Sequence, residues 1–439
     1  MPIHSSARST GRRVAPGGLA VAAILGASLV LAVPESARAA AMPNPTCPQA
    51  LAAVGFPISA EDVIPPVPAP VELTATVEGA LPDGLHVYND SHRAYIYGTP
   101  TTVQTLTFTV KATVDDDGNG TTSASTCTVT VRPAPVVSRI GGKDRFEQSA
   151  LVSKASFTKV DRVYLASGEK FPDALSAASV AGRLDAPLLL TPSAHITIEV
   201  LDELKRLAPG NVIILGGPRA VSTTVMDEVA MALGTATTVT RIGGADRFEV
   251  SRNLTTSQYG IPNPDGVFVA TGNNFPDALG ASPAAALGNS PVLLVNGGAT
   301  SLGPAERLTL FRLGPKATTI IGGPAAVNAS LETDLAASYP TTRVGGADRF
   351  EVNARLNKAT FKPGVDTLYL ASGSTFPDAL SGGAAAGAHD DPLAITEQNC
   401  VSAATASTIG RLVPSKVVIL GGTASLGSAL DSLTLCPTE

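Results

Sequence analysis

The sequence predicts an α/β protein of three tandem modules with parallel sheets, preceded by a small all-β sandwich. Three observations support this: a segment that occurs three times at intervals of about 100 residues, apolar β-runs that alternate with helical stretches in each copy, and a period-two pattern ahead of the first copy. Because a uniformly apolar strand must be covered on both faces, we expect parallel sheets between layers of helices.

The repeated segment reads R-[IV]-G-G-x-D-R-F-E and begins at Arg139, Arg241 and Arg343. Two further motifs follow in the same order in every copy: F-P-D-A-L, and a Gly-Gly pair that closes an apolar run. This order indicates a tandem triplication, with predicted modules at 139–240, 241–342 and 343–439. In the first module the pattern predicts strands near 162–166, 187–190 and 211–215, and helices near 172–184, 197–207 and 222–233.

Residues 1–41 have the composition of a secretory signal peptide: a basic start, an apolar stretch over 17–33 and a small-residue cleavage site. An uncleaved membrane anchor is the alternative. The apolar stretch is short for a membrane span and is diluted with Gly and Ala, which favours cleavage. We therefore expect an exported protein with no membrane attachment after cleavage.

A proline-rich segment over 42–70 precedes β-patterned runs over 71–132, and a linker over 133–138 leads into the repeats. The order L-P-D-G-L, then Y-I-Y-G-T-P, resembles the immunoglobulin-like domains of secreted bacterial proteins. Between two of the runs, Asp115, Asp117 and Asn119 match the opening of a calcium loop. The twelfth position is Thr126 rather than the required Glu, which favours a polar hairpin turn.

The four cysteines suggest two disulfides in an exported chain. Three connectivities are possible; Cys47–Cys127 and Cys400–Cys436 is the economical one, because the first pair precedes the repeats and the second lies in the third copy. The first two copies have no cysteine, so we expect no metal, redox or cofactor site common to the repeats.

Charge and motif content exclude several classes of function. The formal net charge is −6, whereas a nucleic-acid binder needs a basic excess, so a nucleic-acid partner is not expected. The sequence contains no G-x-S-x-G, no H-E-x-x-H and no P-loop lysine, and its five histidines lie outside the repeated motifs. We therefore expect no catalytic residues and no enzyme activity.

The acidic residues of the repeated segment fit capping boxes, in which an Asp and the Glu three positions later satisfy free backbone N–H groups. These predicted structural caps are Asp144 and Glu147, Asp246 and Glu249, and Asp348 and Glu351. The arginine after each Asp opposes the helix dipole, so it needs a carboxylate or an anionic ligand nearby. The internal candidates are Asp173, Asp277 and Asp378 of F-P-D-A-L; an ion pair within or between repeats and a ligand contact both remain open.

The Gly-Gly pairs, which begin at Gly216, Gly322 and Gly421, lack the spacing of a phosphate-binding turn and favour tight strand-to-helix packing. Together with the other motifs and an apolar P-L-L-L run, they resemble the type 2 cell-wall-binding repeat of Gram-positive surface proteins, over 139 to about 436. The resemblance implies a Toprim-like fold, three modules packed as a pseudo-threefold trimer, and non-covalent attachment to anionic wall polymers of the secondary-polysaccharide or teichoic type. A monomer with three pseudo-symmetric modules is one arrangement of this kind; packing between chains stays open.

The resemblance also implies polymer-binding residues. The family segment associated with polymer matches Pro187, Leu188, Leu189 and Leu190, and Pro291, Val292, Leu293 and Leu294. The third copy departs to P-L-A-I at 392–395, so equal binding by all three copies is not expected. The motif arginines suit an anionic polymer better than a neutral glycan, because tryptophan is absent and aromatics are few. The predicted contacts are Arg139, Arg145, Arg241, Arg247, Arg343 and Arg349.

The third copy differs at its end as well. After the first two copies the next R-[IV]-G-G strand follows the last helix, but only a few residues follow position 433. If that strand normally completes a module, the third copy is truncated and Cys400–Cys436 staples it.

These features predict a secreted, S-layer-like surface protein held at the cell wall, without enzyme activity. The alternatives are a secreted scaffold or signalling module without wall affinity and, less favoured, an accessory component of a wall hydrolase.

Overall fold

The computed structural model describes residues 44–64, 72–90, 93–115, 121–170, 172–274 and 276–437. The predicted signal peptide lies outside these residues, and so do Asp117 and Asn119 of the calcium-loop candidate. No helix in the described part of the chain is long and apolar enough to cross a membrane.

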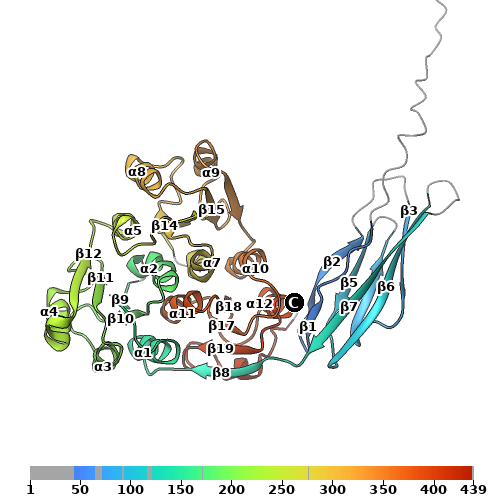
Figure 1. Cartoon of the computed structure of the whole chain (residues 1–439), viewed down its shortest axis with the longest axis horizontal. Helices are drawn as coiled ribbons and strands as arrows, with labels where there is room; N and C mark the ends of the chain where they lie inside the picture. Colours follow the sequence, from blue (N-terminus) through green and yellow to red (C-terminus); the bar gives the residue numbers. More distant parts are fainter. Residues whose placement is uncertain are drawn as a thin grey trace, which may run out of the picture. The chain divides into compact units, whose positions relative to one another are not determined.

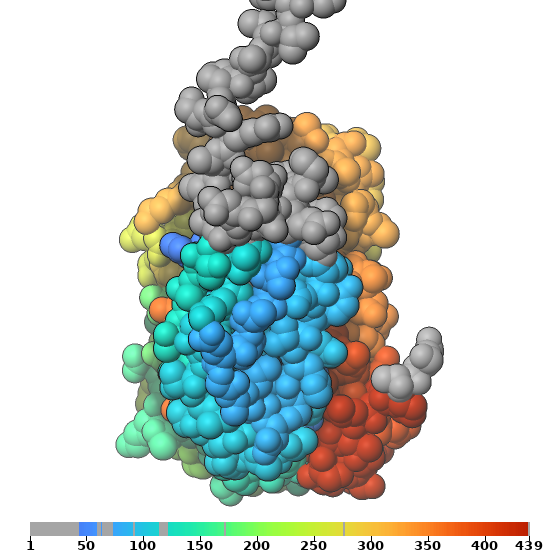
Figure 2. Space-filling view, turned by 90° about the vertical axis from the view of Figure 1, so that its right-hand side faces the viewer, coloured from blue at the N-terminus to red at the C-terminus, as the bar shows by residue number. Residues whose placement is uncertain are grey.

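The region before the repeats consists of two β-sheets. The larger has the order β1-β7-β6-β3 and the smaller the order β2-β5-β4. The strands are β1 (Leu51–Ala53), β2 (Ile58–Ile64), β3 (Glu72–Glu78), β4 (Leu85–Asn89), β5 (Ala94–Gly98), β6 (Gln104–Asp115) and β7 (Thr121–Arg132). β1 and β2 lie within the proline-rich segment 42–70. The strands of this region therefore begin before residue 71, where the β-pattern was expected to start. Figure 2 shows this region in blue and cyan.

Alternation along these strands buries one face of each sheet. Phe108, Val110 and Ala112 of β6 are almost fully buried, while Thr109 and Lys111 between them are more exposed. On the other face, cross-strand threonine pairs such as Thr107 and Thr128 exchange hydrogen bonds. This period-two pattern is the one expected from the sequence.

The three repeats hold three four-stranded parallel sheets with the same strand order (Figure 1). The first consists of β10 (Leu188–Thr191), β9 (Arg162–Ser167), β11 (Asn211–Leu215) and β12 (Thr238–Ile242). The second consists of β14 (Val292–Val295), β13 (Gly266–Thr271), β15 (Ala317–Ile321) and β16 (Thr341–Val344). The third consists of β18 (Leu393–Thr396), β17 (Thr367–Ser372), β19 (Lys416–Leu420) and β8 (Val136–Ile140).

Helices alternate with these strands, as the apolar pattern predicts. They are α1 (Arg145–Ser156), α2 (Pro172–Arg183), α3 (Ile198–Leu207), α4 (Thr223–Leu233), α5 (Arg247–Thr256), α6 (Pro276–Leu279), α7 (Ala281–Leu287), α8 (Pro304–Leu313), α9 (Ala329–Ala336), α10 (Arg349–Thr360), α11 (Pro377–Ala388) and α12 (Ala403–Leu412). Two short 3₁₀ helices, Gly234–Ala236 and Ser428–Ser432, complete the repeats in the described residues.

The strand of each R-[IV]-G-G motif lies in the sheet of the preceding copy. β12 pairs with β11 and β16 pairs with β15, so each of these motifs is the physical junction between two copies. The third sheet follows the same plan, although no such strand follows it in the sequence. β8, from the start of the first copy, pairs with β19 and provides the missing strand. The third sheet is therefore complete, and the truncation expected from the sequence is compensated by closing the three copies into a ring.

Three helices rich in small residues pack against each other where the copies meet. They are α2, α7 and α11, one from each copy. A methyl group added at Gly182 of α2 would come within 3.0 Å of the Gly387 Cα in α11. One added at Gly387 would meet the Ala286 Cβ of α7 at 2.9 Å. Small side chains are required because three helix backbones approach each other too closely for larger ones.

Both disulfides have the expected pairing. Cys47 bonds to Cys127 and Cys400 bonds to Cys436. The second joins the loop before α12 to the end of the chain, where Val401 and Leu435 also form a bridge. This disulfide holds the terminal segment against the third copy.

Candidate functional site

The first arginine of each repeated segment binds the Gly-Gly turn of the preceding copy. One guanidinium nitrogen, Nη1, donates to a glycine carbonyl in every case: Arg139 to Gly421 at 2.9 Å, Arg241 to Gly216 at 2.9 Å, and Arg343 to Gly322 at 2.7 Å.

Acidic partners complete two of these clamps: Asp431 for Arg139 and Glu332 for Arg343. The side chains of Arg139 and Arg343 are only 16% and 12% exposed, and burial lowers the pKa of Arg241. All three guanidinium groups are thus engaged by protein, and their observed contacts are structural.

The Gly-Gly turn is shaped by the aspartate of F-P-D-A-L. Gly216 has a φ of +95°, and a Cβ there would lie 2.3 Å from a carboxylate oxygen of Asp173. Gly322 and Gly421 have φ values of +105° and +111°. The same contact recurs with Asp277 and Asp378, each at 2.4 Å. Glycine is therefore required twice over, for its backbone conformation and for the room that the carboxylate occupies.

Burial raises the pKa of Asp173, Asp277 and Asp378 above the usual aspartate value. In each case the second arginine of the next segment opposes this rise in pKa: Arg247 acts on Asp173, Arg349 on Asp277 and Arg145 on Asp378. A hydrogen bond from Ser425 lowers the pKa of Asp378 more than Arg145 does, and Lys170 adds to the effect of Arg247 on Asp173. The attraction therefore runs between neighbouring copies, and it closes the ring between the third copy and the first. Of the internal partners that the sequence left open, this attraction involves the aspartate of the neighbouring repeat.

These second arginines also have a fixed hydrogen bond. Nη1 of Arg145, Arg247 and Arg349 donates at 2.7 Å to the carbonyl of Gly168, Gly272 and Gly373, respectively. Each acceptor follows the first strand of the same copy. The guanidinium group is thereby fixed at the end of that strand, and its charge acts on the buried aspartate of the neighbouring copy.

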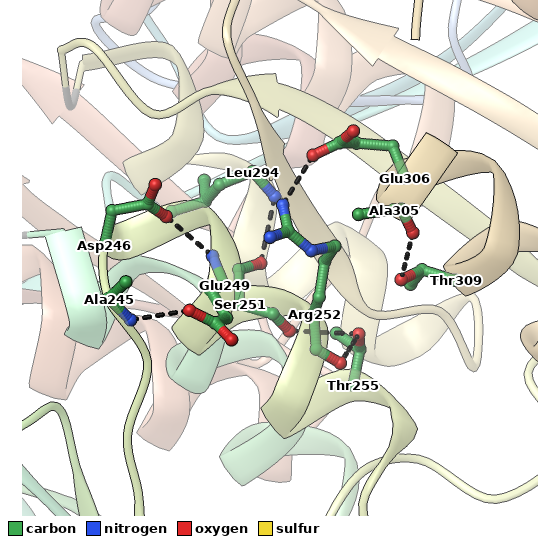
Figure 3. A network of polar contacts seen from close by, with 10 residues as sticks. All are labelled: Ala245, Asp246, Glu249, Ser251, Arg252, Thr255, Leu294, Ala305, Glu306 and Thr309. Carbon is green, nitrogen blue, oxygen red and sulfur yellow. Dashed lines mark hydrogen bonds and ion pairs between the residues drawn. The ribbon is translucent and has the colours of Figure 1, made fainter. Parts of the chain in front are cut away.

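The acidic residues of the segment organise the helix starts, as Figure 3 shows for α5. Asp246 accepts from the backbone N–H of Glu249 at 2.9 Å, and the Glu249 carboxylate accepts from Ala245 N–H at 2.6 Å. Asp144 and Asp348 are N-caps in the same way, and Glu147 and Glu351 accept from residues 143 and 347. The glutamate thus reaches the N–H of the residue ahead of the N-cap rather than that of the N-cap itself.

The predicted P-L-L-L contacts are buried edge strands. Leu188, Leu189 and Leu190 are at most 1% exposed. Val292, Leu293 and Leu294 are inaccessible to solvent. Pro187 and Pro291 are buried as well. These side chains cannot reach a ligand in this conformation, because they form the core between the sheet and its helices.

A helix side chain accepts a hydrogen bond from a backbone N–H of each of these edge strands. Leu190 N–H donates to Ser149 Oγ and Leu294 N–H to Ser251 Oγ, both at 3.0 Å (Figure 3 shows the second). In the third copy Asn353 takes the serine's place and accepts from Ile395. The P-L-A-I variation therefore preserves a buried strand rather than altering a surface.

The three motifs converge on clefts between neighbouring copies. The first cleft, between copies one and two, measures 510 Å³ and contains the aspartate that follows Pro172, the Gly-Gly turn and the start of α5. Its charged residues are Lys170, Asp173, Arg219, Asp246 and Arg247. The corresponding cleft between copies three and one measures 330 Å³ and is lined by Lys143, Asp144, Arg145 and Asp378, among others.

Lys170 and Arg219 lie outside the repeated motifs, so the sequence alone did not indicate a role for them. Both side chains are exposed at the first cleft, and no ion pair of either is seen in the described part of the chain. The only signal for them was their place: Lys170 precedes F-P-D-A-L, and Arg219 follows the Gly-Gly pair by two residues.

The region of two β-sheets before the repeats, called the β-region from here on, presents a second surface that the composition did not predict. Tyr88 and Tyr95 stack across β4 and β5 with ring centres 4.7 Å apart, and Tyr97 lies 5.8 Å from Tyr95. Tyr88 and Tyr97 are 39% and 41% exposed. Such cross-strand aromatic pairs stabilise a hairpin, and these also make one face of the small sheet aromatic.

Among the described residues, no group of three or more His, Cys, Asp or Glu side chains is arranged to hold a metal ion. The acidic residues at the clefts are explained as N-caps and as partners of arginine.

Two family models match the sequence of this chain. The model of the family described as "Cell wall binding domain 2 (CWB2)" matches residues 139–226, 241–332 and 343–431. The model described as "Putative Ig domain" matches residues 39–132.

Two curated relatives come from Bacillus subtilis (strain 168). The N-acetylmuramoyl-L-alanine amidase LytC is 27% identical over 296 residues, which are 66% of this chain and 56% of the relative. The amidase enhancer is 28% identical over 297 residues, which are 68% of this chain and 40% of the relative. The chain thus spans about half the length of these relatives or less.

Two solved structures from Clostridium difficile share the fold. Cwp6 superposes with a TM-score of 0.62 at 21% identity, covering 91% of this chain and 69% of Cwp6. Cwp8 gives a TM-score of 0.60 at 20% identity, covering 83% of this chain and 62% of Cwp8. The three family matches together span more than half of the chain and contain every repeated motif. The chain belongs to the cell wall binding domain 2 family.

Proposed function

We propose that this chain is an exported, non-enzymatic protein held non-covalently at the cell wall by repeats that bind an anionic secondary polymer. The observation that carries this proposal is the convergence of all three repeated motifs on clefts between neighbouring copies. Each cleft has an arginine beside a helix start, and both features favour an oxyanion.

The six motif arginines have two different roles in this proposal. Arg145, Arg247 and Arg349 are the candidates for polymer contact, because the first two line clefts and the third holds the matching position. Arg139, Arg241 and Arg343 clamp the turns and support the clefts from behind. The P-L-L-L strands contribute by positioning the helices that bear the polymer-facing groups.

The proposed architecture has three Toprim-like modules around a pseudo-threefold axis, with boundaries at 139–240, 241–342 and 343–439. The mutual packing of α2, α7 and α11 supports such an axis. The β-region is proposed to be an immunoglobulin-like sandwich, in agreement with its two sheets and its family match.

A sedimentation experiment tests the function. The mature protein is mixed with purified walls before and after phosphate-containing polymers are stripped. We expect the protein to sediment with intact walls and to remain in solution with stripped ones. Binding that is unchanged by stripping would refute an anionic phosphate polymer, and no binding to either would favour the scaffold alternative.

A second candidate function rests on the curated relatives, one of which is named an amidase enhancer. As an accessory component, the chain would increase the activity of a separate wall hydrolase. Measuring wall lysis by a purified amidase, with and without this protein, distinguishes this role from simple attachment.

A further inference from the structure

The three copies have matching motifs, but the clefts between them differ in charge at the positions around those motifs. The position before F-P-D-A-L is Lys170 in the first copy, Asn274 in the second and Thr375 in the third. The position two residues after the Gly-Gly pair is Arg219 in the first copy and alanine, at 325 and 424, in the others.

These differences make the first cleft the most cationic. It brings three cations, Lys170, Arg219 and Arg247, together with two carboxylates, those of Asp173 and Asp246. One carboxylate is an N-cap, and burial raises the pKa of the other. Local charge therefore favours an anion here although the whole chain is acidic.

At the matching positions of the second junction, the only cation is Arg349, beside Asp277 and Asp348. The third junction has a second cation, Lys143, but this side chain pairs with Glu199 of α3. Lys170 and Arg219 form no salt bridge within the described residues, although the charge of Lys170 acts on the buried Asp173. Neither of the other two sites offers two such cations beside its motif arginine.

The space at the first junction is also larger. The first cleft measures 510 Å³, against 330 Å³ for the one between copies three and one. Lys170 and Arg219 come from two different loops of the first copy, and Arg247 comes from the second copy. An oxyanion between them would be contacted from three sides.

We infer that the first cleft is a dedicated oxyanion site. Lys170 and Arg219 give it a higher affinity for an anionic chain than the other two junctions have. This inference rests on the proposed function and narrows it: the three copies build the ring, and one junction provides most of the affinity. The ligand chemistry is a repeating phosphodiester or carboxylate, which a lysine and two arginines bind by charge-assisted hydrogen bonds.

The test uses the mature chain and two defined probes, a glycerol-phosphate oligomer and an oligogalacturonate of similar length. Binding is measured by calorimetry at two salt concentrations. The double variant Lys170→Asn with Arg219→Ala installs neutral residues found in the second copy. We expect it to bind the preferred probe at least about tenfold more weakly and with a flatter salt dependence. The probe that the wild type binds more tightly identifies the class of oxyanion.

A matched control removes the same charge elsewhere. Lys159 and Arg312 are exposed and have no ion pair within the described ranges, so Lys159→Asn with Arg312→Ala should bind like the wild type. The reverse graft, Asn274→Lys with Ala325→Arg, should add a second binding site at the second junction. Circular dichroism checks that every variant remains folded.

The outcomes separate this inference from the proposed function. Equal binding of either probe by the wild type and the Lys170/Arg219 variant would overturn the inference, and so would a wild type that binds neither probe. Loss of affinity in the control variant to the same extent would also overturn it, because general charge would then be responsible. Failure of the wild type to sediment with walls would refute the proposed function instead.

Discussion

The first and third sheets have the same strand order but obtain their last strand differently. β12 reaches the first sheet through one helix and a short connection, whereas β8 reaches the third sheet from the other end of the repeats. The pairings nevertheless match residue for residue: Arg241 lies opposite Ile214, and Arg139 opposite Ile419.

A module is therefore defined by the contacts between its strands and not by the order of those strands in the chain. The clamp from arginine to the glycine carbonyl forms whether the strand is local or distant. The entropy of closing the chain differs, however, because Val136 and Lys416 are about 280 residues apart, whereas Asn211 and Thr238 are about 27 apart. The longer loop costs about 2 kcal/mol more to close. The third sheet should therefore depend more on its side-chain contacts, and the first three of the following four experiments examine this.

The largest effect is expected from a proline in β8. The ladder begins with Val136 N–H donating to Ser415, so by alternation in a parallel pair Ser138 N–H donates to β19. Ser138→Pro removes this bond and should destabilise the chain by about 4 kcal/mol or more, with early proteolysis of the third copy. Thr240→Pro is the matched change in β12. Equal proteolysis of the first and third copies would show that ring closure has no special importance.

The disulfide of the third copy should have the next largest effect. Cys400 and Cys436 are separated by 36 residues, and the first two copies have no equivalent. Cys400→Ser with Cys436→Ser should lower the free energy of unfolding by about 3 kcal/mol. Thermal unfolding of this variant beside Cys47→Ser with Cys127→Ser distinguishes the repeats from the β-region. An unchanged midpoint would mean that the terminal segment needs no staple.

The arginine clamps should show a smaller, graded effect. Arg139 donates to three carbonyls and pairs with Asp431, whereas Arg241 donates to two carbonyls and has no carboxylate partner among the residues that the structure describes. We expect Arg139→Ala to cost about 3 kcal/mol and Arg241→Ala about 2 kcal/mol, measured by urea unfolding. Both variants should retain binding in proportion to their folded fraction. If a folded Arg241→Ala protein did not bind the polymer, Arg241 would have to be counted among the ligand-binding residues.

The smallest effect concerns pH. Burial raises the folded-state pKa of Asp277, so the folded protein binds a proton in a range where the unfolded chain, with a pKa of about 3.9, does not. The contribution of Asp277 to the free energy of unfolding should therefore rise as the pH falls from the raised pKa toward about 4. Asp277→Asn should remove this contribution in pH-dependent thermal unfolding.

Asp334 provides the control for that measurement, because its pKa is lowered, first by the Leu302 N–H and then by Arg307. Its contribution has the opposite sign: it is present above the unfolded pKa and disappears as the pH falls. If Asp277→Asn and Asp334→Asn changed the pH profile in the same direction, burial would not be the dominant influence on Asp277.

The sequence by itself determined the triplication and the parallel α/β character, because these follow from periodicity and apolar patterning. Cysteine positions favoured the observed disulfide pairs over the two other connectivities. It also indicated the helix starts, since a capping box is local: Asp246 and Glu249 act within a few residues of each other. The burial of P-L-L-L was implicit in its apolar composition, although the family resemblance suggested a surface role.

Only the tertiary structure decided which residues share a site. Lys170, Arg219 and Arg247 come from different loops and different copies, and no local pattern relates them. Only the structure separated arginines that clamp turns from those that face clefts, because burial is set by packing between copies. It also completed the third sheet with β8, since strand pairing depends on which edges meet in space and not on which segment comes next in the chain.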